Sequence, residues 1–173
     1  RQPTNMSEVE RDHFISIMNS IMQNSDLQSF SDNIQIDITN EGLRIQIMDT
    51  DNRPMFKPNT AELQPYMEKI ITVIGKMIST QPNYISISGH TATVKAGTSP
   101  GIDFWHISSE RANEVRKFLT QKLIDKNQVV KILGISDREP FDPKDPYGVK
   151  NIRVGITLLN DSAITSYQKS VPK

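Results

Sequence analysis

The sequence predicts an α+β fold in which a mixed β-sheet packs against helices on one of its faces. Five short segments have the apolar patterns of strands, and three longer segments carry apolar residues at helical spacing. Along the chain these segments follow the order helix, hairpin, helix, strand, helix, strand, loop and strand. That order points to a mixed sheet with its helices on one side, preceded by an amphipathic helix.

The first 32 residues are expected to form a linker and this amphipathic helix. Between Met6 and Met22, apolar residues recur at roughly helical spacing among polar neighbours. The helix either covers part of the domain or pairs with a partner. The stretch from Asn24 to Asn33 is rich in Ser, Asp and Asn. The side chains of these residues compete for backbone hydrogen bonds, so we expect a connector there.

The main domain is expected over residues 33–160, and it opens with a β-hairpin. Residues 34–38 alternate Ile with polar residues, and residues 43–47 continue the alternation after a turn at Gly42. Three further strands are expected at 84–88, 129–133 and 152–158. The chain beyond them is polar, so residues 161–173 are expected to form a polar C-terminal tail.

Two helices are expected between these strands. Asn59 followed by Glu62 has the form of a capping box, which predicts a helix start ahead of the apolar stripe that ends at Ile78. A long polar loop follows the strand at 84–88, and binding residues are often found on such loops. Ser108 is expected to cap the second helix.

Composition excludes several function classes. Lys and Arg together number 20, as do Asp and Glu, so net charge gives no reason to expect nucleic acid as a partner. The absence of cysteine excludes disulfides and Cys-ligated metal sites. The sequence does not begin with Met and has no apolar run of about 18 residues. We therefore expect it to be a soluble piece of a longer protein.

No pattern indicates an enzyme, a metal site or a cofactor. Ser108 with the nearby His106 could suggest a hydrolase, but a helix cap explains the serine more simply. A metal site formed by His90, Asp103 and His106 has a spacing that matches no established ligand pattern. Trp105 could stack on a sugar, although we expect it to pack beneath the helix that follows.

Several segments together resemble a known family. Residues 42–49 and 52–56 resemble the start of the peptidoglycan-binding domain in MotB-type flagellar stator proteins, and residues 85–91 end in the Gly-His-Thr triplet of the wider OmpA-like family. Residues 111–113 and 151–154 continue the same framework in the same order. The resemblance covers roughly residues 34–159, outside which lie the N-terminal helix and the C-terminal tail.

The resemblance implies an OmpA-like βαβαβ sandwich that acts as the periplasmic domain of an inner-membrane protein. Such a domain anchors the stator to peptidoglycan by binding the diaminopimelate-containing stem peptide non-covalently. It commonly forms a homodimer, and it works with a MotA-type membrane subunit through a transmembrane segment outside this chain. No enzymatic activity and no cofactor are implied.

The resemblance also suggests which residues bind the ligand. Arg111, expected in the first turn of its helix, offers a planar fork for a carboxylate, reinforced by the amide groups of the helix start. The other expected ligand-binding residues lie in the loop after the Gly-His-Thr triplet and just before the last strand: Thr91, Thr93, Asp103, Asn151 and Arg153.

Three positions depart from the family pattern. Ala92 stands where the family normally has Asp, Phe104 replaces an Asn, and Ile152 replaces the middle residue of Asn-Arg-Arg. A methyl group at position 92 cannot offset an ammonium, so either Asp103 with Thr91 and Thr93 restores binding or the domain mainly dimerises or assembles. The pattern resembles the MotB-like proteins of lateral flagellar systems.

Overall fold

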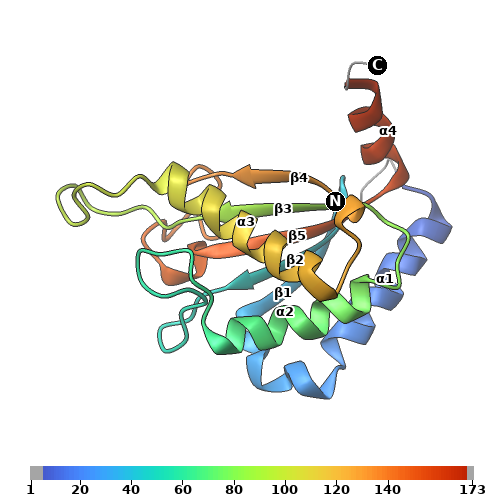
Figure 1. The fold of residues 1–173 in the computed structure, drawn as a ribbon, viewed down its shortest axis with the longest axis horizontal. Helices are drawn as coiled ribbons and strands as arrows, with labels where there is room; N and C mark the ends of the chain where they lie inside the picture. The colour runs from blue at the N-terminus through green and yellow to red at the C-terminus, as the bar shows by residue number, and fades with distance from the viewer. Residues whose placement is uncertain (1–5, 171–173) are drawn as a thin grey trace.

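The computed structural model describes residues 6–170, which contain one five-stranded sheet of order β1-β2-β5-β3-β4 (Figure 1). The pairs β1/β2, β2/β5 and β5/β3 are antiparallel, and β3/β4 is parallel. The mixed sheet expected from the sequence is therefore confirmed. The strand bounds are β1 Ile34–Thr39, β2 Gly42–Met48, β3 Ile85–His90, β4 Val129–Gly134 and β5 Arg153–Leu159.

Two helices, α2 (Pro65–Ile78) and α3 (Phe104–Lys122), cover one face of the sheet, as expected (Figure 1). Most of the apolar stripe of α2 is fully buried, and so are the alternating apolar residues of β2, β3 and β5. These side chains form a single hydrophobic core. Burial of this stripe, at about 25 cal/mol for each Å² of apolar surface, holds α2 against the sheet.

The N-terminal helix α1 (Glu8–Met22) packs against the same core. Ser7 caps it by accepting a hydrogen bond from the Glu10 N–H at 3.1 Å. Phe14, Ile17 and Ile21 are buried, whereas Val9 is exposed. Helix α1 therefore covers part of the domain, which is one of the two roles expected for it.

The expected connector over residues 24–33 is instead the 3-10 helix η1 (Ser25–Asn33). The Asn24 side chain accepts a hydrogen bond from the Asp26 N–H at 2.9 Å and so caps the helix. Leu27 and Phe30 pack into the core. The Ser and Asn content was rightly linked to side-chain capping of the backbone, but the capped segment is helical.

The capping box expected at Asn59 is wrong. Asn59 has a left-handed backbone with φ of 59°, and Glu62 forms an ion pair with Lys57. Helix α2 begins at Pro65, whose missing N–H costs nothing at the first position of a helix. Residues 54–64 instead form an irregular segment that packs beside the sheet, and this segment forms one wall of the site described below.

The remaining helical segments are short. The 3-10 helices η2 (Lys126–Gln128) and η3 (Val149–Asn151) precede β4 and β5. Helix α4 (Asp161–Ser170) lies in the region expected as a polar tail and extends away from the sheet in Figure 1. Its start is capped by the buried Asn160, whose Oδ1 accepts a hydrogen bond from the Ala163 N–H at 2.8 Å.

Candidate functional site

A groove of about 260 Å³ lies where β2 and β3 end, β5 begins and α3 crosses the sheet. Residues that directly adjoin the strands contribute one side, and the first turns of α3 contribute another. The irregular segment that precedes α2 forms the remaining wall. The polar or charged side chains lining the groove are Asp49, Asn59, Thr91, Ser99 and Arg111.

Arg111 is the basic residue of this groove. It lies about two turns into α3, because the helix begins at Phe104, so the expected first-turn position is wrong. Its Nε donates a hydrogen bond to the Thr60 carbonyl at 2.8 Å, and its guanidinium lies 4.7 Å from the centre of the Phe56 ring. These contacts fix the side chain without the amide groups of the helix start. Within residues 6–170, neither Nη atom donates a hydrogen bond.

The charge of Arg111 is only partly balanced. Burial lowers the pKa of the guanidinium, and the nearby Asp49 carboxylate raises it. An arginine remains cationic under such conditions. In the described part of the chain, no carboxylate lies within ion-pair distance of Arg111. The groove therefore presents a cation with two nitrogen atoms available to an anionic ligand.

Asp49 is a groove residue that the sequence reasoning missed. It directly follows β2 and is 7% exposed. Burial raises the pKa of its carboxyl to about 6, while the Met55 N–H and the Arg111 charge act in the opposite direction. The available signal was an acidic residue immediately after a strand that also lies inside the MotB-like segment. Its proximity to Arg111 depends on the tertiary fold.

The two threonines of the loop after β3, which were expected to bind the ligand together, have different surroundings. Thr91 lines the groove, and its buried Oγ1 has no hydrogen-bond partner within residues 6–170. Thr93 does not line it, because its hydroxyl donates a hydrogen bond to Asp137 Oδ2 at 3.0 Å. Between them, Ala92 faces both the groove and a neighbouring depression.

Asp103 caps α3 and does not line the groove around Arg111. Its Oδ1 accepts hydrogen bonds from the N–H groups of Trp105 and His106, at 3.0 and 3.2 Å. The expectation that Ser108 caps this helix is therefore wrong. Ser108 is fully buried in the second turn, and its Oγ accepts a hydrogen bond from the Ser136 N–H at 3.1 Å.

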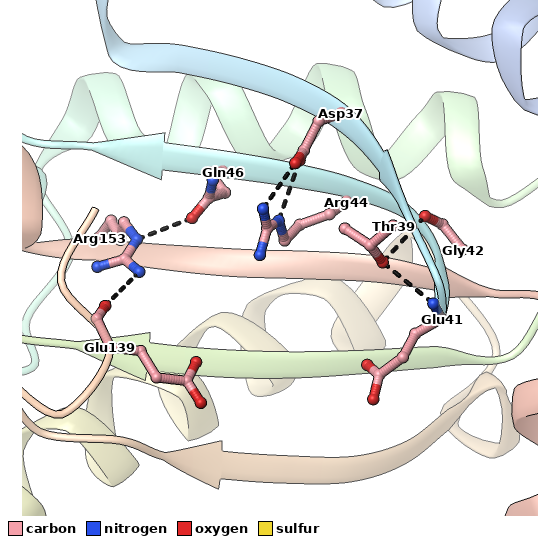
Figure 2. Close-up of polar contacts among 8 residues, drawn as sticks. All are labelled: Asp37, Thr39, Glu41, Gly42, Arg44, Gln46, Glu139 and Arg153. Atoms are coloured by element: carbon pink, nitrogen blue, oxygen red, sulfur yellow. Dashed lines mark hydrogen bonds and ion pairs between the residues drawn. The ribbon is translucent and has the colours of Figure 1, made fainter. Parts of the chain in front are cut away.

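Asn151 and Arg153 are buried beside the groove but do not line it. The Asn151 amide donates hydrogen bonds to the carbonyls of Asp145 and Gly148, at 2.8 and 2.9 Å. Figure 2 shows Arg153 directed along the polar face of the sheet. There it donates to Gln46 Oε1 at 2.8 Å and to the Glu139 carbonyl at 2.7 Å. Both residues thus fix the loop that precedes β5.

The three departures from the family pattern meet in the groove. Ala92, Phe104 and Ile152 all line it and make part of its wall apolar. Trp105 points elsewhere, since half of its surface is exposed and the Arg138 guanidinium lies 5.7 Å from its ring. The expectation that Trp105 packs beneath the following helix is wrong.

Residues 6–170 contain no cluster of three or more His, Cys, Asp or Glu side chains that could hold a metal ion. His90 is buried, and its Nε2 lies 2.9 Å from the Ser88 hydroxyl. Burial, together with the positive charges of Arg153 and Arg44, lowers the pKa of His90 to about 3. In the same described range, every helix is too short or too polar to cross a membrane.

The fold is shared with several solved structures. A MotB-like protein from Desulfovibrio vulgaris superposes with a TM-score of 0.69 at 17% sequence identity, covering 88% of this chain and 99% of that one. The periplasmic domain of Helicobacter pylori MotB, residues 90–256, gives a TM-score of 0.65 at 21% identity and covers 85% and 95%. At these identities the likeness establishes the fold.

Sequence comparison gives more specific relatives. Motility protein B of Escherichia coli K12 is 35% identical over 138 residues, which cover 79% of this chain and 45% of that protein. The flagellar export/assembly protein LafU of Escherichia coli O44:H18 is 27% identical over 163 residues, covering 94% and 52%. The chain spans about half the length of these relatives. The OmpA family matches residues 55–153, more than half of the chain, and this protein therefore belongs to the OmpA family.

Proposed function

We propose that this chain is the periplasmic domain of a flagellar stator B subunit and anchors the stator by binding the diaminopimelate-containing stem peptide of peptidoglycan. The observation that carries the proposal is the Arg111 guanidinium, which is held in an open groove with both Nη atoms available. A planar guanidinium binds a carboxylate through two parallel hydrogen bonds. The stem peptide offers such carboxylates.

The relatives support this proposal. Motility protein B is similar to 79% of this chain, and the solved Helicobacter pylori structure is that of a periplasmic domain. We extend the proposal to the whole protein: a membrane segment outside this chain, a homodimer, and a MotA-type subunit as partner. In that assembly the anchor resists torque, so that ion flow turns the rotor.

The remaining expected site residues have proposed roles that follow from their contacts. Thr91 lines the groove, and rotation of its side chain would bring its buried hydroxyl, which has no partner within residues 6–170, to the ligand. Asp103 and Thr93 position the ends of the polar loop, because the first caps α3 and the second is bonded to Asp137. Asn151 and Arg153 position the groove wall between them through the loop contacts described above.

The test is co-sedimentation with purified sacculi. We expect the wild-type chain to sediment with them and Arg111→Ala to remain in the supernatant. Arg116→Ala is the matched control, because it removes one positive charge from the same helix outside the groove. Ala92→Asp should bind at least as well as the wild type. Failure of the wild type to sediment at any salt concentration would contradict the proposal.

A second candidate function is a module that mainly dimerises or assists stator assembly. The three apolar replacements in the groove wall favour it, because they remove polar groups that would hold a ligand. This function predicts a stable dimer in analytical ultracentrifugation together with no binding to sacculi. Dimerisation combined with Arg111-dependent binding to sacculi would retain the anchor function.

A further inference from the structure

Asp49 brings a negative charge to the groove from the wall formed by the end of β2. Its own N–H donates to the Ile152 carbonyl at 2.9 Å, which fixes its backbone beside β5. Its Oδ1 accepts a hydrogen bond from the Met55 N–H at 2.8 Å. Within residues 6–170, Oδ2 accepts no hydrogen bond. One carboxylate oxygen is thus anchored, and the other is left for a ligand.

The acid and the base of the groove face the same space without pairing. The Arg111 charge acts on Asp49, although the two groups are farther apart than an ion pair in the described structure. The Thr60 carbonyl and the Phe56 ring fix the Arg111 side chain, so it does not form an ion pair with Asp49. A ligand fits these charges when it carries an anionic and a cationic group close together.

We propose that Asp49 is a ligand-binding residue and that Asp49 and Arg111 together select a zwitterionic amino-acid centre. Arg111 donates to the carboxylate of that centre, and Asp49 Oδ2 accepts from its ammonium. The inference rests on the proposed peptidoglycan-binding function and adds the residue that takes the ammonium. Ala92 in the same groove carries only a methyl group, and Asp49 then serves as the anionic partner of the ammonium.

Burial gives the interaction its strength. An acid that is 7% exposed has lost most of its water, so its ionised form gains more from an arriving ammonium than a surface carboxylate would. A charge-assisted hydrogen bond of this kind is worth about 1.5 to 3 kcal/mol, or roughly a tenfold to a hundredfold change in affinity.

The test compares two small ligands by NMR titration of the intact chain. Diaminopimelate carries carboxylates and ammonium groups, whereas pimelate has the same carbon chain and carboxylates without the ammonium groups. We expect the wild type to prefer diaminopimelate and Asp49→Asn to lose at least tenfold in affinity for it while binding pimelate unchanged. Arg111→Ala should weaken both. Asp51→Asn, an exposed position in the same turn, is the matched control.

The design separates the inference from the function on which it rests. Asparagine keeps an oxygen for the Met55 N–H, so Asp49→Asn should fold, and Ala92→Asp in that background should restore binding from the other wall. If Asp49→Asn binds diaminopimelate as the wild type does while sacculi still bind through Arg111, the inference alone is wrong. If the wild type binds neither sacculi nor diaminopimelate, the proposed function is wrong as well.

Discussion

Asp49 illustrates how a single residue in this groove couples binding to stability. An ionised carboxylate that is 7% exposed is poorly hydrated, and the Met55 N–H and the Arg111 charge offset only part of that loss. The result is a pKa of about 6 instead of 3.8. A residue held in a charged form that the fold disfavours is typical of functional sites.

The first prediction is that Asp49 makes the protein less stable as pH rises. Between pH 3.8 and 6 the folded state binds more protons than the unfolded state, so stability is lost as pH rises through this interval. The shift corresponds to up to about 3 kcal/mol above pH 6. Asp49→Asn should therefore be more stable than the wild type at pH 8 and about equal to it below pH 4. Urea denaturation at both pH values measures the difference.

The control for this prediction is Asp51→Asn, which removes the same charge from an exposed position in the same turn. It should change the free energy of unfolding by less than about 0.5 kcal/mol at either pH. A wild type that is as stable as Asp49→Asn at pH 8 would show that burial of the Asp49 carboxylate does not destabilise the folded protein.

Residues of the site could be predicted from the sequence only where a family motif marked them. Arg111 was found because its motif resembles the family, and the structure places it in the groove. Asp49 was missed because the groove that it shares with Arg111 brings together residues 62 positions apart in the sequence. Asn151 and Arg153 were expected in the site, but their hydrogen bonds point into a neighbouring loop, which sequence spacing does not reveal.

Among the elements, α3 determines the geometry of the groove because it lies unusually close to the sheet. A Cβ atom at Gly89 would lie 2.0 Å from the Ser108 carbonyl oxygen, and one at Gly134 would lie 2.8 Å from the Ser109 backbone nitrogen. Both glycines therefore permit backbone to approach backbone. The position of Arg111 depends on this close approach.

The second prediction concerns Gly89→Ala. The added methyl group would force α3 away from β3, and we expect a loss of about 1 to 3 kcal/mol in the free energy of unfolding together with weaker binding to sacculi. Gly155→Ala is the matched control, because its methyl group would meet only the movable Ser88 hydroxyl. Thermal unfolding and co-sedimentation provide the two measurements. Equal stability of both variants would contradict the close packing of α3.

The third prediction separates capping from ligand binding at Asp103. Asp103→Ala removes the acceptor for two N–H groups at the start of α3 and should cost about 1 kcal/mol. Asp103→Ser keeps an acceptor and should retain stability and binding to sacculi. If Asp103→Ser is stable but no longer binds, Asp103 contacts the ligand directly. Urea denaturation and co-sedimentation distinguish these results.

Strands were easier to predict than helix starts. The alternation in residues 34–38 and 43–47 follows from one buried face, and the observed hairpin has that register. Asn59 and Ser108 were chosen as caps because their side chains commonly cap helices. Tertiary contacts decided otherwise: Asn59 adopts a left-handed backbone, and Ser108 is buried against the loop after β4.

At the scale of the whole molecule, α1 and η1 belong to the same hydrophobic core as the OmpA-like sheet. Phe14 is fully buried in that core with residues from β2 and α2. The sequence suggested a boundary near residue 32, because a polar connector was expected over residues 24–33 and the strand alternation begins at Ile34. Polar composition did not mark a separate unit, since η1 contributes Leu27 and Phe30 to the shared core.

The last prediction is that the N-terminal helix unfolds together with the domain. Phe14→Ala should lower the free energy of unfolding by about 3 to 5 kcal/mol, because it leaves a cavity in the shared core. Val9→Ala, on the exposed face of the same helix, should change it by less than about 0.5 kcal/mol. Trp105 is the only tryptophan and lies in the first turn of α3, so its fluorescence reports on unfolding of α3 and not of α1. Urea transitions followed by fluorescence and by far-UV circular dichroism should coincide and shift together in Phe14→Ala. An unchanged fluorescence transition with an earlier loss of helical signal would instead show that α1 unfolds independently of the domain.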